Sequence, residues 1–160
     1  MGNNAIRQAV QDDLPEILAL QKKAFLQNAV LMDKYDLPPL LQTIEGIAED
    51  SANGIILKYQ LPDGSIAGSV RAHQDTEGTC YIGKLAVDPD KQSRGIGYAL
   101  MREIERYFPD CRKFSLFTSE NTPHTLRLYT KVGYRVTHRK DLGGIRMLFM
   151  EKLNSSIETE

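Results

Sequence analysis

Residues 81 to 101 read Tyr-Ile-Gly-Lys-Leu-Ala-Val-Asp-Pro-Asp-Lys-Gln-Ser-Arg-Gly-Ile-Gly-Tyr-Ala-Leu-Met. They pass from an apolar strand through a glycine-bearing loop straight into a helix. Such a junction leaves several backbone N–H groups of the helix N-terminus unpaired and pointing one way. Gly95 and Gly97 let the backbone approach a ligand without a Cβ in between. The stretch therefore predicts an anion site, and a phosphate is the expected ligand.

The chain before this stretch predicts two helices and a three-stranded meander. A short strand is followed by Asp13 and Glu16, which have the spacing of a capping box at a helix start. The apolar periodicity of that helix runs to about Leu26, and the pattern breaks over Asn28–Pro39 before a second helix. The expected ranges are Ile6–Val10 for the first strand, Leu40–Glu49 for the second helix, and Ile55–Gln60, Ser65–Ala72 and Thr79–Val87 for the meander.

The chain after this stretch alternates again. Pro109 ends the helix of the quoted stretch, and either Asn121 or Thr122 caps a fourth helix that closes at Gly133. The remaining ranges are strands at Lys113–Thr118, Tyr134–Arg139 and Arg146–Lys152, and a polar, frayed tail at Asn154–Glu160. The fold class is mixed α/β (α+β), with one mostly antiparallel mixed sheet of about seven strands and about four helices. We expect a single domain over residues 1–160 with its core at 6–153.

Composition sets the class of protein. The chain has 160 residues, 41% of them hydrophobic, and a net charge of −1. That charge predicts no attraction to nucleic acid or to an anionic membrane. No apolar run reaches the ~18 residues that cross a bilayer, and the first residues lack a signal-peptide core, so a cytoplasmic location is expected. Cys80 and Cys111 are expected to be free structural thiols, and no metal site is predicted.

Two common nucleotide motifs do not fit the glycine loop. A dinucleotide fingerprint needs a third glycine and a carboxylate after the next strand, but Leu100 and Thr118-Ser119 stand there. A phosphate-binding loop of the Gly-Lys-Ser/Thr kind is absent from the sequence. A nicotinamide dinucleotide is therefore not the expected ligand.

The wider pattern resembles the GNAT-type N-acetyltransferases. Gln92-Ser93-Arg94-Gly95-Ile96-Gly97, preceded by Leu85-Ala86-Val87, is similar to that family's coenzyme A loop. Asn121 followed by Leu128-Tyr129-Thr130-Lys131-Val132-Gly133-Tyr134 resembles its second signature. The predicted elements match the family from about Ile6 to Leu153.

The resemblance implies a role for each matching residue. The pyrophosphate of acetyl-CoA would lie on the loop, and the pantetheine arm would pair with the preceding strand through its backbone. Tyr129 would protonate the leaving thiolate, with helix packing as the plainer alternative, and Asn121 would contact the pantetheine unless it only caps the helix. For Lys91, Arg94 and Lys131, a phosphate contact and a solvated surface charge both stay open. The implied cofactor-binding residues are Leu85, Ala86, Val87, Gln92, Ser93, Arg94, Gly95, Ile96, Gly97 and Asn121.

The implied reaction is direct attack of a primary amine on the thioester of acetyl-CoA. The alternative is a non-catalytic sensor that binds acyl-CoA, because Gly83 and Lys84 occupy the neighbourhood where many relatives carry a catalytic Glu. The general base is unassigned among His73, Asp75, Glu77 and Tyr81, each of which is more simply structural.

The acceptor is expected to be a small-molecule or peptide amine. The resemblance places its pocket at 27–40 and 139–146. Asp33, Tyr35 and Asp36 would suit a cationic amine, although a solvated loop is the simpler explanation of these residues. Exposed hairpins leave a homodimer possible.

Overall fold

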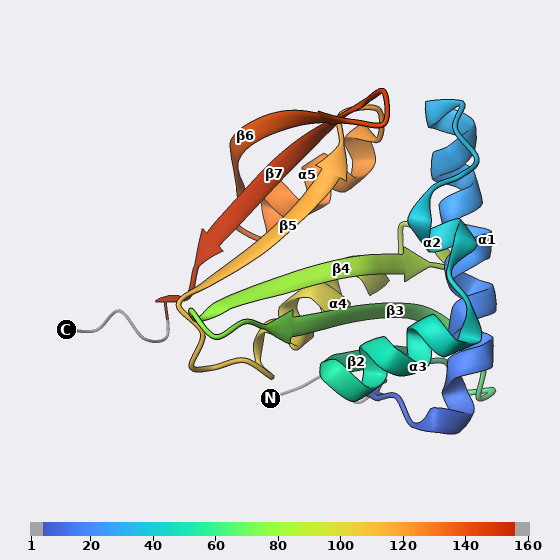
Figure 1. Cartoon of the computed structure of the whole chain (residues 1–160). Coiled ribbons are helices and arrows are strands. Elements are labelled where there is room, and N and C mark those ends of the chain that lie inside the picture. Colours follow the sequence, from blue (N-terminus) through green and yellow to red (C-terminus); the bar gives the residue numbers. More distant parts are fainter. Residues whose placement is uncertain (1–4, 156–160) are drawn as a thin grey trace.

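One seven-stranded sheet organises the molecule. The strands are β1 (Ile6–Gln8), β2 (Ile55–Gln60), β3 (Ile66–Gln74), β4 (Thr79–Val87), β5 (Lys113–Ser119), β6 (Arg135–Leu142) and β7 (Ile145–Leu153). The helices are α1 (Leu14–Met32), α2 (Pro38–Leu41), α3 (Ile44–Asn53), α4 (Ile96–Glu105) and α5 (Pro123–Lys131). They are seen in a computed structural model that describes residues 5–155 (Figure 1).

The strand order is β1-β2-β3-β4-β5-β7-β6, and every neighbouring pair is antiparallel except β4 and β5. This confirms the expected mixed α/β fold with a mostly antiparallel sheet. Within residues 5–155 there are five α-helices rather than about four, since a short α2 precedes α3.

The first helices differ from the predicted ranges. Helix α1 continues to Met32 instead of ending near Leu26, and it stops where Asp33 takes the left-handed conformation at φ 51°. The second predicted helix is split, because Pro38 begins α2 and Thr43 caps α3 by accepting a hydrogen bond from the backbone N–H of Gly46 at 3.0 Å.

The predicted capping box is also wrong. The Asp13 carboxylate accepts from the N–H of Val10 at 2.8 Å and pairs with Lys58 at 2.8 Å, outside the helix it was expected to cap. The Glu16 carboxylate accepts from the N–H of Ile66 at 2.9 Å, at the start of β3. Both carboxylates therefore interact with residues distant in the sequence instead of capping α1.

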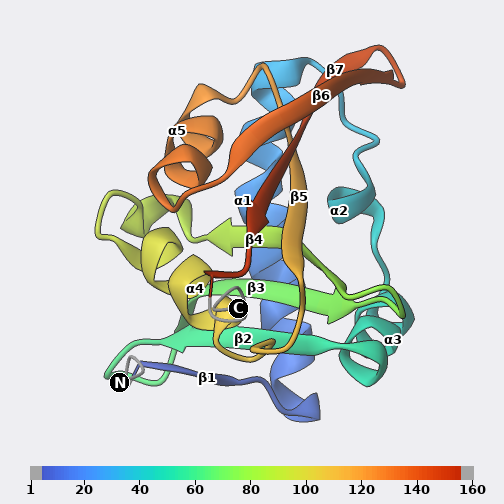
Figure 2. The same cartoon turned by 90° about the vertical axis from the view of Figure 1, so that its left-hand side faces the viewer.

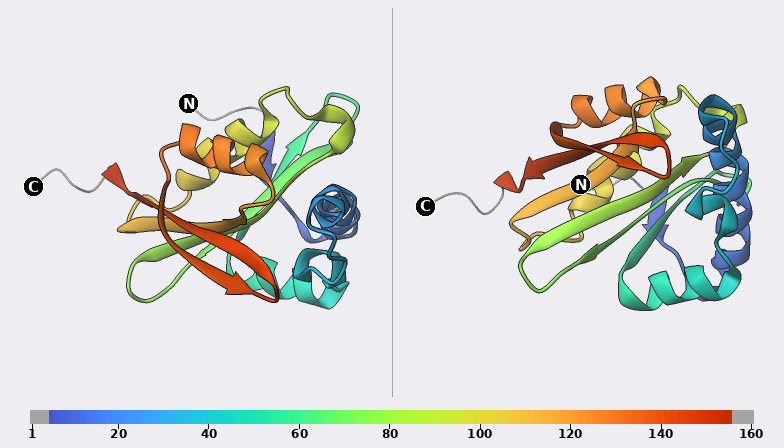
Figure 3. Two further views of the ribbon diagram at one scale, coloured as in Figure 1. Left: turned by 90° about the horizontal axis from the view of Figure 1, so that it is seen from above. Right: turned by 45° about the horizontal axis from the view of Figure 1, so that its top comes forward.

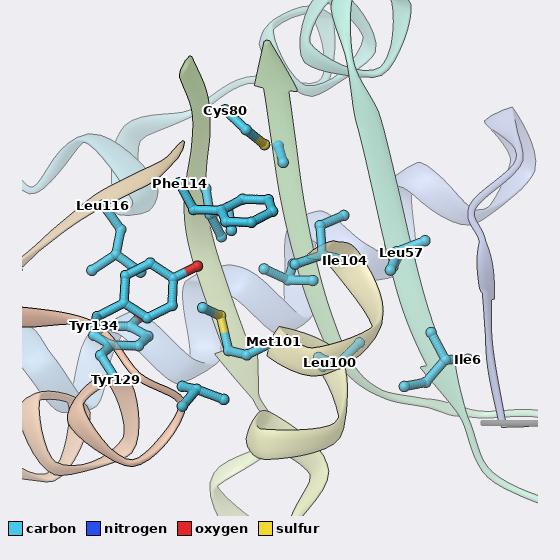
Figure 4. Close-up of a cluster of buried hydrophobic side chains, with 14 of the residues drawn as sticks. Ile6, Leu57, Cys80, Leu100, Met101, Ile104, Phe114, Leu116, Tyr129 and Tyr134 are labelled. Carbon is cyan, nitrogen blue, oxygen red and sulfur yellow. The ribbon is translucent and has the colours of Figure 1, made fainter. Parts of the chain in front are cut away.

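Helices cover both faces of the sheet. Figure 2 shows α1 behind β3 and β4 and α4 in front of them. The larger buried cluster lies on the α4 side and includes Leu100, Met101 and Ile104 (Figure 4). Helix α4 lies so close to β3 that a Cβ on Gly68 would come within 2.8 Å of Ile96 and 2.9 Å of Leu100. The N-terminal end of α4 is therefore held against the sheet.

The sheet opens between β4 and β5. Only the first residues of these strands pair: Thr79–Tyr81 of β4 lies parallel to Lys113–Ser115 of β5. Both strands continue beyond this pairing. Figure 1 and the right panel of Figure 3 show them diverging, with α5 and α4 on one side of the opening and α1 on the other. The far half of β4 thus presents backbone groups along its β5 side without a strand partner.

Three further expectations concern the cysteines, the tail and the membrane. Cys80 and Cys111 are free and buried, as expected. Asn154 is not frayed, because its side-chain amide donates to the carbonyl oxygens of Pro109 and Cys111 at 3.1 and 2.8 Å. Residues 156–160 of the predicted tail lie outside the described residues. Among the described helices, none has the length and apolar character needed to cross a bilayer.

Candidate active site

Two adjoining cavities open where β4 and β5 separate. The loop cavity, of about 450 Å³, is bordered by the segment between β4 and α4, and the large cavity, of about 600 Å³, lies between α1–α3 and the ends of β4 and β5. Phe25, Asn28, Leu85 and Thr125 line both. Since four residues border both spaces, the two cavities are neighbours.

Most of the predicted cofactor residues line the loop cavity. Arg94 and Asn121 do not, and both are exposed. The lining includes Leu85, Ala86, Val87, Gln92, Ser93, Gly95, Ile96 and Gly97. The loop and the end of the strand before it therefore border the same cavity.

Gly95 shapes the anion site at the start of α4. It is the N-cap residue at φ 80°, and no atom lies within 4 Å of the position that a Cβ would take. The first helical hydrogen bond runs from the N–H of Ala99 to the carbonyl of Gly95 at 3.0 Å. The N–H groups of Ile96, Gly97 and Tyr98 therefore precede the hydrogen-bonded ladder, and the helix dipole favours an anion there.

Gly97 lines the loop cavity, and packing gives a further reason for a glycine at this position. A Cβ on this residue would lie 3.2 Å from Leu128 and 3.7 Å from Val87. The missing side chain at Gly97 lets α4 pack against α5, whereas Gly95 leaves open space for a ligand.

The cations near the loop differ in position. Lys131 lines the loop cavity with its Nζ 5.0 Å from the centre of the Tyr98 ring. Lys91 and Arg94 are not among the lining residues, and Lys91 pairs with Asp88 at 3.5 Å. His124 also lines the cavity, and burial together with the nearby Arg127 lowers its pKa.

Tyr129 lines the large cavity, four residues after Thr125, the α5 residue that borders both cavities. It is only 8% exposed, and its ring meets Tyr134 edge-on at 6.4 Å between centroids (Figure 4). Burial raises the pKa of Tyr129. The phenol is therefore protonated at neutral pH and suited to donate a proton.

Three threonine hydroxyl groups, rather than Asn121, provide polar groups to the large cavity in this region. Thr125 shares hydrogen bonds with Thr118 and, at 2.9 Å, with Thr122, and all three line the large cavity. Asn121 lies one residue before this cluster and donates its backbone N–H to Ser119 Oγ at 2.9 Å.

A charged network lies at the opposite end of the large cavity. Arg71, only 6% exposed, donates to Gln42 Oε1 and to Asp50 Oδ2, each at 3.0 Å, and to Gln21 Oε1 at 2.5 Å. Lys84 Nζ lies 4.0 Å from the same Asp50 oxygen. Burial opposes ionisation of Asp50, but the hydrogen bonds from Gln42 and Arg71 keep its pKa below the usual value.

The combination of a glycine-loop anion site, a splayed β4–β5 pair and a buried tyrosine agrees with a known family. A model of the acetyltransferase (GNAT) family matches residues 14–134. The chain belongs to the GNAT family. The resemblance seen in its two signatures is thereby confirmed.

Solved GNAT structures share the fold at low sequence identity. The PaiA N-acetyltransferase of Thermoplasma acidophilum, in complex with coenzyme A, has a TM-score of 0.78 at 16% identity, covering 92% of this chain and 97% of that one. A phosphinothricin acetyltransferase of Sinorhizobium meliloti, in complex with AcCoA, has a TM-score of 0.77 at 15% identity, covering 97% and 91%.

A curated relative matches by sequence. The UPF0157 protein YqkA of Bacillus subtilis is 26% identical over 120 residues, which are 75% of this chain. The chain spans about a third of that relative, since the match covers 34% of it.

The predicted acceptor region contributes only in part to the large cavity. Met32, Leu37, Pro38 and Pro39 line the large cavity, but the three residues expected to attract a cation do not, and the hairpin segment 139–146 contributes nothing to the lining. Tyr35 is 56% exposed and Asp36 pairs with Lys34 at 2.9 Å. The residues not expected from sequence are Phe25, Gln42, Asp50, Arg71, Thr118 and Thr125. These residues are far apart in the sequence, so the sequence does not indicate that they lie close together. The apolar periodicity of the first helix was the one signal that included Phe25.

Proposed function

We propose that this GNAT protein transfers the acetyl group of acetyl-CoA to a primary amine, with Tyr129 as the general acid. The junction of the two cavities supports the proposal most directly. Residues 92–97 and the open space at Gly95 suit the pyrophosphate, and the unpaired edge of Leu85–Val87 suits the pantetheine arm. The thioester would then lie near Tyr129, facing the large cavity.

The reaction needs a deprotonated amine. An alkylammonium of ordinary pKa costs roughly 4.6 kcal/mol to deprotonate at pH 7. The nitrogen lone pair then attacks the thioester carbonyl carbon, and an N–C bond forms while the carbonyl electrons move to oxygen, where the N–H of Val87 would support the charge. As the carbonyl reforms, the C–S bond breaks and Tyr129 donates its proton to the departing sulfur. The nitrogen gives up one proton to water as the amide forms, and a proton from water restores the phenol of Tyr129.

The ligands of GNAT structures with this fold favour the same donor. PaiA is in complex with coenzyme A and the Sinorhizobium enzyme with AcCoA. We propose a small-molecule or peptide amine as the acceptor. A homodimer and a cytoplasmic location remain predictions.

Release of free thiol tests the function. The protein is incubated with acetyl-CoA and a panel of primary amines, and thiol is followed against a no-amine control. Amine-dependent release is expected. Tight acetyl-CoA binding without thiol release for any amine would instead support the acyl-CoA sensor. One observation favours this alternative: within residues 5–155, Asp50 is the one carboxylate that lines either cavity, and it already binds Arg71.

A further inference from the structure

We propose that the acceptor is an amine that also carries a carboxylate on an apolar skeleton, as an apolar amino acid does, and that Lys84 binds the carboxylate. This inference rests on the proposed acetyl transfer and names the substrate class of the same site. It replaces the cationic amine that residues of the Tyr35 loop would suit.

The charges around the large cavity do not cancel. Among the described residues that line it, Arg71 and Lys84 are cations and Asp50 is the only carboxylate. Arg71 is buried and uses both terminal nitrogens on Asp50, Gln42 and Gln21. Asp50 thus neutralises Arg71, which leaves the charge of Lys84 in excess and favours an anion over a second cation.

Lys84 is free to contact a ligand. The nearest carboxylate oxygen of Asp50 is 4.0 Å from its Nζ, which is beyond hydrogen-bond length, and the side chain is 30% exposed. Burial, and then the charge of Arg71, lower the pKa of Lys84. A bound carboxylate would offset both effects, because an opposite charge favours the ammonium form.

A β-bulge places Lys84 in this position. Lys84 and Leu85 together face the single residue Val70, because the register shifts between Ser69–Ala86 and Arg71–Gly83. Lys84 takes the left-handed conformation, at φ 50°. A lysine at positive φ is unusual, and bulges commonly redirect a side chain toward a site. Lys84 lines the large cavity, and the next residue, Leu85, borders both cavities.

The rest of the large cavity suits an apolar skeleton. Apolar residues from α1 to α2 and from four strands line it. They are Phe25, Met32, Leu37, Pro38, Pro39, Ala72, Ile82, Leu85, Phe117 and Met147. A polyamine would place cations against these walls and against Lys84, whereas the N-terminus of a peptide lacks a carboxylate near its amine.

A matched substrate series tests the inference. Leucine, methionine and phenylalanine are compared with their amides, with the corresponding amines that lack the carboxylate, with spermidine and with a peptide. We expect kcat/KM to be about tenfold or more higher for the free acid than for the amide, as for a charge-assisted hydrogen bond. Binding of N-acetyl-leucine and of its amide to the coenzyme A complex, measured by calorimetry, gives a readout that does not depend on turnover.

Lys84 variants identify the group that binds the carboxylate. Lys84→Met should raise KM for the free acids about tenfold, with a smaller effect on kcat and no effect on the amides. Lys84→Arg should restore most of the preference because it retains the charge. Lys22→Met, on an exposed face of α1 outside both cavities, is the control and should behave as the unaltered protein.

The outcomes separate the two proposals. Acetylation of the amides, spermidine or the peptide at least as efficient as that of the free acids would overturn the inference and leave acetyl transfer standing. Equal loss of acids and amides in Lys84→Met, with weaker acetyl-CoA binding, would show a structural role for Lys84 and also overturn it. No thiol release with any amine would overturn both proposals.

Discussion

Tyr129 derives its proposed role from burial. The same contacts that place its ring in the core raise the pKa of its hydroxyl, so packing and proton donation are one property of the residue rather than competing explanations. Its edge-on neighbour Tyr134 differs, since that hydroxyl donates to Glu105 at 2.9 Å. Of the two, Tyr129 alone lines the large cavity.

Replacing Tyr129 by Phe should lower kcat about a hundredfold or more and change acetyl-CoA affinity little, because the ring stays while the proton donor is lost. Steady-state kinetics and equilibrium binding measure the two effects. Tyr107→Phe, at an exposed position beyond α4, is the control. An unchanged kcat would show that the thiolate takes its proton from another group.

The raised pKa of Tyr129 also predicts the alkaline behaviour. Because burial shifts this pKa above its ordinary value of about 10, the phenol keeps its proton through pH ~9.5. The kcat–pH profile should therefore not fall between about pH 8 and 9.5, while deprotonation of the amine raises the rate. A decline centred below about pH 9 would contradict a protonated, buried Tyr129.

Gly95 and Gly64 form a matched pair of residues. Both have positive φ, 80° and 92°, and at both no atom lies within 4 Å of the position that a Cβ would take, but only Gly95 lines a cavity. Alanine at either site should destabilise the protein by roughly 1 kcal/mol, the cost of a left-handed alanine. Only Gly95→Ala should also weaken acetyl-CoA binding, by about tenfold, in a calorimetric titration. Equal affinities of the two variants would place the cofactor elsewhere.

At the scale of elements, local signals predicted the strands and the hairpin well. The β6–β7 hairpin turns at Gly143-Gly144, both at positive φ, which fits the conformation that a two-residue hairpin requires. The limits of α1 and α3 were less well predicted. Asn28 resembles a helix breaker, but the next residue, Ala29, is buried in α1. The two prolines also resemble breakers, but they fit the first turn of α2.

The fit of α4 on β3 gives an element-scale prediction. Gly68→Ala would place a methyl group within 3 Å of side-chain atoms of Ile96 and Leu100, so these side chains or α4 itself must shift. We expect a loss of about 1–3 kcal/mol of stability, together with weaker acetyl-CoA binding because the anion site is the start of the same helix. Gly83→Ala in β4, with no atom within 4 Å of the added Cβ, is the control for the melting temperature alone, because Gly83 also lines the large cavity. Thermal unfolding and binding measure both effects, and an unchanged melting temperature would contradict the close packing.

At the scale of the whole molecule, the opening of the sheet determines where ligands enter. The short parallel pairing of β4 and β5 leaves an edge inside the fold, and α1, α3 and α5 enclose the space beside it. GNAT relatives at 15–16% identity retain this fold. We infer that an extended ligand arm completes the edge.

Amide hydrogen exchange tests this at the same scale. Acetyl-CoA should slow exchange in peptides covering 85–87 and 92–98, since an added strand partner and a bound anion protect these amides. The β1–β2 pair, which lies at the far edge of the sheet, should be unaffected. Protection confined to regions outside 83–98 would contradict the proposed donor position.

The sequence by itself determined most of the proposed donor half of the site. The strand, the glycine loop and the helix after it are consecutive, so their chemistry follows from local conformation, and Tyr129 lies in a recognisable signature. The acceptor half depends on tertiary structure: Gln42, Asp50, Arg71 and Lys84 come from the α2–α3 segment, α3, β3 and a bulge in β4. Whether a charge is free or neutralised depends on partners distant in the chain, and only folding brings those partners together.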